Sequence, residues 1–268
     1  MHNFSLPTPG FGTYRLEADE AKSAVANALD VGYRHIDTAQ IYENEAEVGD
    51  AIAGSGLKRD EIFLTTKVWF ENLSSAKFIT SVQNSLTLLN TDYVDLLLIH
   101  WPSPDNKVPM AEYLKELKGC KERGLTKHIG VSNFTQSQLD EALAILGKDQ
   151  ILTNQIEVHP NFQNTELVKY CQRNNIQVTA YMPLGVGKVM ESDVLQAIAH
   201  EHDTTPSAVA LAWLNHKKIV AIPSSTNVEH MRDNLTAKQL MLTADEIVKI
   251  DAIEPQERIV DPDFAPDW

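Results

Sequence analysis

The alternation of short apolar runs with amphipathic stretches is the feature that most constrains the fold of this chain. Eight short runs of apolar and β-branched residues predict strands: Phe11–Arg15, Arg34–Thr38, Ile62–Val68, Val94–His100, His128–Ser132, Thr153–Val158, Gln177–Met182 and Ile219–Ser224. Stretches with helical spacing follow them: Ala21–Asp30, Glu45–Ala53, Ser75–Leu89, Met110–Arg123, Gln136–Leu146, Glu166–Asn174, Asp193–His202 and Val228–Leu235. This order of elements is typical of parallel strand–helix units.

Eight strand–helix units predict an α/β protein in which residues 1–268 form a single (β/α)8 barrel domain. At 268 residues and 43% hydrophobic residues, the chain can bury one core of this size. We expect an N-terminal hairpin, and additional C-terminal helices at Pro206–His216 and Ala244–Ile253. Thr205 can cap the first of these helices, and Pro206 suits its first turn. An open doubly wound sheet is the alternative that this pattern leaves open.

Charge and cysteine content restrict the partners of the chain. Its 23 Lys and Arg residues against 37 Asp and Glu residues give a net charge of −14, which opposes broad binding to nucleic acid or anionic membranes. No apolar run approaches the roughly 20 residues of a membrane span, and Met1–Pro7 has no signal-peptide pattern. Cys120 and Cys171 fall on predicted helices and make no disulfide framework. We expect a cytoplasmic monomer that acts on a small molecule.

Four titratable residues occur where predicted strands end. Asp37 ends the second strand and Tyr42 follows shortly after it, while Lys67 and His100 end the third and fourth strands. Each residue alone has an ordinary structural interpretation, as a helix cap, a core phenol, a solvated lysine or a core histidine. Parallel barrels assemble their active sites at the carboxyl ends of strands, so the joint placement favours one shared pocket.

These four residues suit the protonation of a carbonyl oxygen. A free phenol has a pKa near ~10, and a neighbouring Lys67 ammonium would lower that of Tyr42 by stabilising phenolate. Asp37 would keep Lys67 charged and oriented, and His100 could orient the substrate oxygen. Tyr42 would then act as a general acid. The carbon atom would need a hydride, which no side chain supplies, so a nicotinamide cofactor is implied.

Two late loops are candidates for binding the cofactor's phosphates. No G-x-G-x-x-G follows the first strand, so a Rossmann site is unsupported. The segment 181–188, Tyr-Met-Pro-Leu-Gly-Val-Gly-Lys, contains glycines that permit close backbone approach. The segment 222–227, Ile-Pro-Ser-Ser-Thr-Asn, leads into a helix whose N-terminus could hold an anion. Both segments could equally be ordinary strand–helix loops.

Two long motifs identify a family resemblance that covers essentially the whole chain. The sequence from Gly32 through Asp37 to Gly49, and the sequence Lys127–Phe134, resemble the two signatures of the aldo-keto reductases. The resemblance implies catalytic roles for Asp37, Lys67, His100 and Tyr42, with Tyr42 as proton donor. It implies cofactor contacts from Gly12, Thr13, Tyr14, Asp37, Ser132, Asn133, Gln155, Tyr181, Met182, Pro183, Leu184 and Gly185, with Tyr181 stacking on the nicotinamide. Substrate contacts would come from Tyr14, Tyr42, Trp69, His100 and Trp101, and no metal is implied.

One departure from the family pattern concerns the choice of cofactor. Members commonly carry a lysine and an arginine near the adenosine 2′-phosphate, where this chain has Ser224 and His230. The remaining residues of that cofactor region fit the pattern: Ser225, Thr226, Asn227, Asp233 and Asn234. Arg232 is a nearby cation that could compensate. We expect NADPH to be preferred, with NADH also accepted.

The substrate is less constrained by the sequence. Short segments at Trp101–Pro109 and at the C-terminus predict an open mouth suited to small or polar carbonyls, and the tail 259–268 is too rich in proline for a helix and too aromatic for plain disorder. The segments Tyr42–Glu45 and Trp69–Asn72 most resemble bacterial diketogluconate reductases, enzymes that also take methylglyoxal and other aldehydes. Two alternatives stay open: a barrel aldolase with a Schiff base on Lys67, and a cofactor-binding regulatory subunit.

Overall fold

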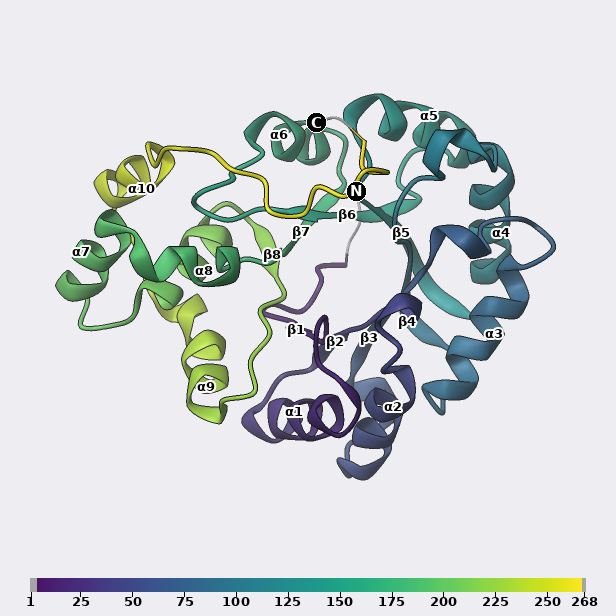
Figure 1. The fold of residues 1–268 in the computed structure, drawn as a ribbon, viewed down its shortest axis with the longest axis horizontal. Helices are drawn as coiled ribbons and strands as arrows, with labels where there is room; N and C mark the ends of the chain where they lie inside the picture. The colour runs from purple at the N-terminus through teal and green to yellow at the C-terminus, as the bar shows by residue number, and fades with distance from the viewer. Residues whose placement is uncertain (1–3, 267–268) are drawn as a thin grey trace.

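An eight-stranded parallel sheet lies at the centre of the computed structural model, which describes residues 4–266 (Figure 1). Its strands are β1 (Phe11–Gly12), β2 (His35–Asp37), β3 (Phe63–Val68), β4 (Val94–Ile99), β5 (Thr126–Ser132), β6 (Ile151–Glu157), β7 (Gln177–Tyr181) and β8 (Ile219–Ala221). Each strand pairs with the next one along the chain. This consecutive order contradicts the doubly wound alternative, because such a sheet reverses its strand order at a switch point.

Backbone hydrogen bonds also join the first and last strands. Gly10 N donates to Ala221 O at 2.9 Å, and Gly12 N donates to Pro223 O at 3.0 Å. A Cβ atom at Gly12 would lie only 2.8 Å from Ile222 O, so the missing side chain allows this close approach. The sheet is therefore curled, with its two ends in contact.

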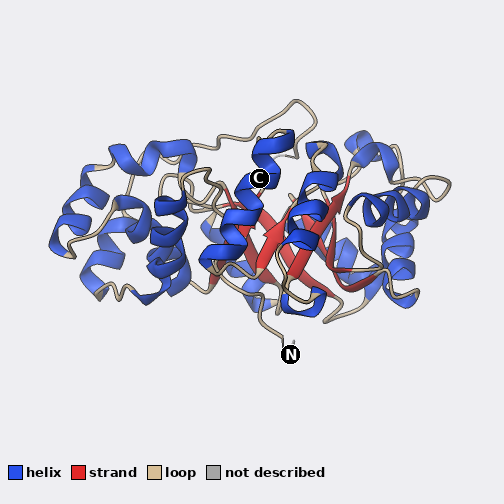
Figure 2. Ribbon diagram, turned by 90° about the horizontal axis from the view of Figure 1, so that it is seen from below, coloured by secondary structure: helices blue, strands red, loops and turns tan. Residues whose placement is uncertain are grey.

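Helices surround the sheet and separate its strands in sequence (Figure 2). They are α1 (Ala18–Val31), α2 (Glu45–Gly54), α3 (Phe78–Leu88), α4 (Met110–Glu122), α5 (Gln136–Leu146), α6 (Thr165–Arg173), α7 (Asp193–Glu201), α8 (Pro206–His216), α9 (Val228–Thr236) and α10 (Ala244–Asp251). Thr205 caps α8 as predicted, since its side chain accepts a hydrogen bond from Ala208 N. No helix between residues 4 and 266 is long and apolar enough to span a membrane.

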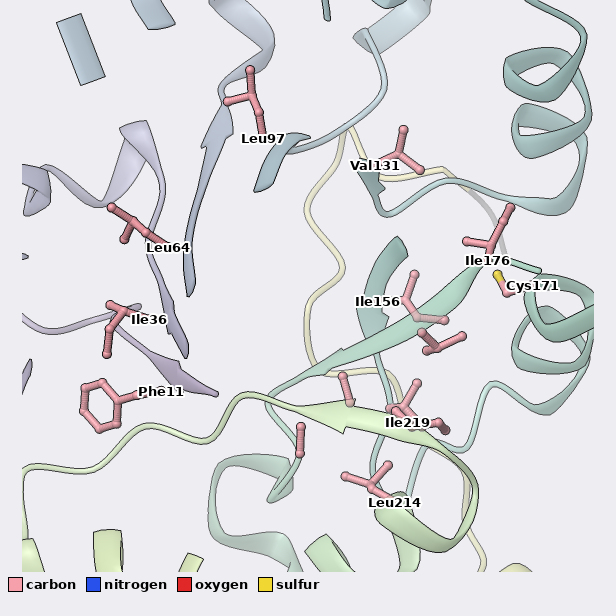
Figure 3. Close-up of a cluster of buried hydrophobic side chains, with 14 of the residues drawn as sticks. Phe11, Ile36, Leu64, Leu97, Val131, Ile156, Cys171, Ile176, Leu214 and Ile219 are labelled. Carbon is pink, nitrogen blue, oxygen red and sulfur yellow. The ribbon is translucent and has the colours of Figure 1, made fainter. Parts of the chain in front are cut away.

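The main core lies between the strands and the helices, as Figure 3 shows. Alternate residues of a strand point to opposite faces of the sheet. In β4, Leu97 accordingly packs in the main core, while Leu96 and Leu98 belong to a second cluster with Leu6 of the N-terminal segment. The near-continuous apolar run of β4 therefore fills both faces of the sheet.

The N-terminal segment does not form the predicted hairpin. Residues 4–10 contain no strand before β1, and residues 1–3 lie outside the described structure. Pro7 and Pro9 lack the backbone N–H groups that a hairpin ladder requires. Phe4 instead stacks on His128 at the amino end of the sheet, with ring centroids 4.7 Å apart.

The C-terminal segment returns from α10 across β7 and β6, shown in yellow in Figure 1. Glu257 N donates to Asn161 O at 2.7 Å in the loop after β6. The segment is neither helical nor a strand within the described residues, in agreement with its proline content. It reaches the carboxyl ends of the strands, where the cavity described below lies.

Candidate active site

A cavity of about 870 Å³ opens at the carboxyl ends of the strands. Fourteen of the residues that the sequence nominates line it: Gly12, Tyr14, Asp37, Tyr42, Trp69, His100, Trp101, Asn133, Gln155, Tyr181, Met182, Pro183, Leu184 and Ser224. These residues lie at the ends of the strands or in the loops that follow them. The fold therefore brings together residues that are more than 200 positions apart in the sequence. One shared pocket is what the strand-end pattern predicts.

A buried ion pair lies at the wall of this cavity, where Asp37 belongs to the lining and Lys67 lies behind it. Lys67 Nζ is 2.5 Å from Asp37 Oδ1, and the side chains of both residues are at most 2% exposed. The other carboxylate oxygen, Asp37 Oδ2, accepts a hydrogen bond of 2.7 Å from Gln155 Nε2. Two buried charges are tolerated in one place only when they pair and their remaining hydrogen-bonding sites are filled, as they are here.

All three protons of the Lys67 ammonium have acceptors. Besides Asp37, Nζ donates to Thr38 O at 2.9 Å and to Tyr42 Oη at 3.3 Å. Burial lowers the pKa of Lys67, while the charge and the hydrogen bond of Asp37 oppose that shift. An ammonium that is 0% exposed and fully bonded has no lone pair to attack a carbonyl. The geometry therefore disfavours the Schiff-base aldolase.

Tyr42 faces the cavity from a 3-10 turn, Gln40–Tyr42, that lies between β2 and α2. The side chain of Gln40 fixes this turn, because its Oε1 accepts hydrogen bonds from Trp69 N and Asn72 Nδ2, each at 3.0 Å. The Tyr42 ring lies 5.2 Å from the Tyr14 ring between centroids. The phenol is thus held beside Lys67 by loops that follow two different strands.

The pKa of Tyr42 shifts in the direction opposite to the sequence-based expectation. Burial, then the negative charge of Asp37 and then Tyr14, raise the pKa of Tyr42 well above its ordinary value. We expected Lys67 to lower this pKa. The physical reason for the difference is that Asp37 offsets the Lys67 charge at 2.5 Å, while desolvation penalises phenolate. Tyr42 therefore stays protonated throughout the physiological range.

His100 follows β4 and lies edge-on to the Tyr42 ring, with centroids 5.6 Å apart. Its backbone carbonyl accepts a hydrogen bond of 2.9 Å from Asn133 Nδ2. Burial and then the positive charge of Lys67 lower the pKa of His100 well below the imidazole range. The ring is therefore neutral, and its buried Nδ1 has no hydrogen-bond partner among residues 4–266. A neutral imidazole that faces a cavity can orient a polar atom of a ligand.

The predicted nicotinamide contacts form one hydrogen-bonded group at the ends of β5, β6 and β7. Ser132 Oγ donates to Gln155 O at 2.8 Å, and Tyr181 Oη donates to Asn133 Oδ1 at 2.9 Å. Asn133 adopts a left-handed conformation with φ of 63°, which asparagine tolerates better than most residues. Thr13 lies behind the cavity wall, where its hydroxyl donates to Asp37 O at 3.2 Å.

The residues predicted near the adenosine end lie apart from the buried centre. Ser224 lines the cavity, whereas the others are outside it: Ser225, Thr226, Asn227, His230, Asp233 and Asn234. The Asn227 side chain caps α9 by accepting from Glu229 N at 2.8 Å. Arg232 pairs with Glu229 at 3.1 Å, so part of its charge is already engaged. Gly185 also lies outside the cavity lining, in the turn after β7.

Several lining residues escaped the sequence-based prediction. The larger part of this set comes from the loop after β1 and from the C-terminal segment: Arg15, Leu16, Glu17, Ile259, Val260, Asp261, Pro262 and Phe264. Phe264 packs edge-on against Trp101, with centroids 5.4 Å apart and planes at 90°. Phe264, an aromatic residue in a proline-rich tail, is the one sequence signal that indicates a place for the C-terminal segment at the site. The segment thus lines the cavity whose mouth its short length predicts to be open.

Similarity to known proteins agrees with this geometry. The sequence profile described as the Aldo/keto reductase family matches residues 8–255. The chain belongs to the aldo/keto reductase family. Its membership confirms the resemblance given by the two motifs. No group of three or more His, Cys, Asp or Glu residues within the described range 4–266 could hold a metal ion.

Individual relatives of this aldo/keto reductase cover nearly the entire chain. Methylglyoxal reductase DkgB of Yersinia pestis is 47% identical over 98% of this chain and 99% of its own length. The crystal structure of a putative 2,5-diketo-D-gluconic acid reductase B has a TM-score of 0.94 at 40% identity, over 98% of this chain and 94% of that one. An aldo-keto reductase of Bombyx mori, solved in complex with NADP, has a TM-score of 0.89 at 32% identity, over 96% and 92%.

The family and the geometry of the site together define the activity. The chain is an oxidoreductase that reduces carbonyl groups of small molecules, and members of its family use NAD(P)H. The regulatory-subunit alternative is not favoured, since the relatives named here are reductases.

Proposed function

We propose that this aldo/keto reductase reduces small aldehydes and ketones with NADPH, accepts NADH as well, and uses Tyr42 as its proton donor. One observation carries the proposal. A protonated phenol and a neutral imidazole face the same cavity, and a buried lysine donates a hydrogen bond to the phenol oxygen at 3.3 Å. This set of groups suits a reaction in which a carbonyl oxygen gains negative charge and then a proton.

The proton step follows from the contacts of Tyr42. When bound, the cofactor supplies a hydride to the carbonyl carbon, and the two electrons of the C–O π bond move onto oxygen. The oxygen takes the proton of Tyr42 Oη, because an alkoxide is a stronger base than a phenolate. Lys67 Nζ, already hydrogen-bonded to Tyr42 Oη, stabilises the phenolate, and Asp37 keeps Lys67 protonated.

His100 and the aromatic side chains position the substrate in this proposal. A neutral His100 ring can donate a hydrogen bond to the substrate oxygen without competing as an acid. Trp69 lies edge-on to His100, with centroids 5.2 Å apart, and Trp101 and Tyr14 also line the cavity. They would exclude water around the reacting carbon and contact the substrate's apolar part.

We infer that the cavity holds the nicotinamide and the phosphates of a dinucleotide. Its lining runs from Trp69 beside His100 to Ser224 after β8. The amides of Asn133 and Gln155 would hold the carboxamide, Tyr181 would face the nicotinamide ring, and the turn 182–185 would border the phosphates. Ser224 and the N-terminal residues of α9 would contact the adenosine end. The relative from Bombyx mori, solved in complex with NADP, supports the binding of a dinucleotide but does not assign its contacts.

The same proposal includes the closure of the barrel, the domain organisation, the oligomeric state, the localisation and the substrates. We infer that the curled sheet closes as one (β/α)8 barrel, on the basis of the two hydrogen bonds between the ends of β1 and β8. We also infer that residues 1–268 work as one domain and as a cytoplasmic monomer. Methylglyoxal and diketogluconate are the proposed substrates, because the names of two relatives include them.

The test is the consumption of NADPH by the purified protein, followed by its near-ultraviolet absorbance, with methylglyoxal as substrate. The proposal predicts turnover with NADPH and slower turnover with NADH. No consumption with methylglyoxal, 2,5-diketogluconate or an aromatic aldehyde would refute it. Trapping of pyruvate on Lys67 by borohydride would instead support the aldolase.

A further inference from the structure

Glu157 is a buried carboxylate that the reaction described above does not use. It ends β6 and is 0% exposed. Its Oε1 accepts hydrogen bonds from Ile259 N at 2.7 Å and His159 Nε2 at 3.1 Å, and its Oε2 accepts from Val260 N at 2.8 Å. Burial of an ionised carboxylate is costly unless such donors surround it. Two of the three donors come from residues about one hundred positions later in the chain.

The segment that Glu157 holds forms one wall of the cavity. Ile259 and Val260 line the cavity themselves, and Phe264 follows them by only a few residues. The Phe264 ring meets Phe70 and Trp101 edge-on, with centroid distances of 4.9 and 5.4 Å. These contacts close an aromatic wall on the side of the cavity that the tail covers.

The ring of Trp69 separates the aromatic wall from His100, one of the groups proposed to act on the substrate. Trp69 lies edge-on to His100 at 5.2 Å and edge-on to Phe264 at 6.0 Å between centroids. A substrate of two or three carbons beside Tyr42 and His100 need not extend as far as Phe264. An aromatic aldehyde would extend into the wall. The position of the tail therefore bears mainly on larger, apolar substrates.

A second charged link between the tail and the barrel is exposed. Lys188 and Glu257 pair at 2.5 Å, but their side chains are 43% and 57% exposed. Ion pairs at the surface contribute little, since water screens them and the side chains lose conformational freedom. A hydrogen bond to a buried charged acceptor is stronger than one between neutral groups. Glu157 is accordingly the stronger of these two attachments.

We propose that Glu157 is a positioning residue that fastens residues 257–266 over the cavity and so sets the preference for aromatic over small carbonyl substrates. The kinetic part rests on the proposed reductase function. Glutamine cannot replace this carboxylate, because its amide would point an N–H group at one of the two backbone N–H donors. Both carboxylate oxygens of Glu157 are needed to hold the segment.

Hydrogen–deuterium exchange tests the fastening without any need for activity. In E157Q, exchange in peptides covering residues 257–266 should accelerate by about tenfold or more, the factor for one lost hydrogen bond of ~1.4 kcal/mol, with the strands unchanged. E257Q removes the exposed ion pair and is the matched control, with little change expected. If E157Q does not fold, V260P removes one donor from the tail side and should give the same local acceleration. Unchanged exchange in the tail would overturn the proposal.

Kinetics test the consequence for substrate choice. In E157Q, the KM for benzaldehyde should rise by about tenfold, with a smaller change for methylglyoxal and little change in kcat for either substrate. F264A should likewise raise the KM for benzaldehyde more than the KM for methylglyoxal. The double variant E157Q/F264A should be no worse than F264A for benzaldehyde, since both act through one wall. Equal losses on both substrates, or additive losses in the double variant, would contradict the proposal.

The two proposals fail in different ways. If the unmodified protein does not oxidise NADPH with any carbonyl, the reductase proposal fails, while exchange still reports whether Glu157 holds the tail. If the protein is an active reductase and E157Q leaves tail exchange unchanged, only the role assigned to Glu157 is wrong.

Discussion

The two halves of the predicted site, the cavity at β2–β4 and the cofactor region at β8 and α9, are built in different ways. Around β2, β3 and β4, Asp37, Lys67 and His100 are at most 8% exposed, and Lys67 has an acceptor for each of its protons. Around β8 and α9, Ser224 and His230 are exposed side chains on a loop and on the first turn of a helix. Burial fixes geometry and shifts pKa values in the first half, whereas water surrounds the second.

This difference assigns separate tasks to the two halves. Replacing a buried, bonded group leaves its partners unsatisfied, so the half at β2–β4 should tolerate almost no change. Exposed substitutions usually have small effects on stability, so residues at α9 can vary and adjust cofactor choice at little cost. We expect the chemistry in the buried half and cofactor selection in the exposed half.

The largest effect should come from breaking the buried ion pair. Lys67→Met leaves Asp37 charged and buried without its partner, so we expect a loss of ~3–5 kcal/mol in the free energy of unfolding and almost complete loss of carbonyl reduction. Urea unfolding and steady-state kinetics measure the two losses. Lys22→Met, which breaks the exposed pair with Asp50, is the control and should change little. If Lys67→Met is folded, active and of normal stability, the buried half tolerates substitution as well as the exposed half does, and the contrast between them is wrong.

A smaller effect should appear as acid sensitivity of the buried half. Burial lowers the pKa of both His35 and His100, so below pH ~6.5 the unfolded chain binds protons that the folded chain does not. Stability should therefore fall as pH falls below ~6.5, by up to ~1.4 kcal/mol per pH unit for each histidine. Unfolding free energies between pH 7.5 and 5.5 measure the slope.

Replacing single histidines shows which residue causes the pH dependence of the unfolding free energy. His35→Asn removes one titrating group and should flatten the pH dependence, whereas the exposed His230→Asn should leave it unchanged. An equal flattening in both variants would show that burial is not the cause.

The smallest effect should be on cofactor preference at the exposed half. With Ser224 and His230 in place of fixed cations, and Arg232 paired with Glu229, we expect only a modest preference for NADPH over NADH. The double variant Ser224→Lys/His230→Arg should widen the ratio of kcat/KM for the two cofactors by about tenfold, because guanidinium binds phosphate in a bidentate way. A large preference in the unmodified enzyme would mean that another cation already holds the 2′-phosphate.

The sequence predicts the elements and the buried half of the site because both depend on local patterns. The predicted helices Gln136–Leu146 and Pro206–His216 match α5 and α8 residue for residue. Asp37 ends β2, Lys67 directly precedes the last residue of β3, and His100 directly follows β4. Apolar periodicity marks where a strand ends, and parallel topology brings those ends together.

Long-range contacts account for what the sequence did not predict. The bonds from Glu157 to Ile259 and Val260 join segments whose spacing carries no pattern. The Tyr42 pKa depends on whether desolvation outweighs a nearby ammonium, and only the packed structure decides that balance. The predicted N-terminal hairpin was wrong for a local reason instead, because Pro7 and Pro9 lack the backbone N–H groups that a hairpin ladder requires.

The most direct test of the central claim, that the buried half protonates the substrate through Tyr42, is the kcat of Tyr42→Phe with methylglyoxal at saturating NADPH. The surface variant Tyr170→Phe serves as the control. We predict a loss of about 10²–10⁴-fold, as expected for a missing general acid, with the Kd for NADPH nearly unchanged. Retention of more than about a tenth of the unmodified kcat would show that another group protonates the substrate, and would contradict this account.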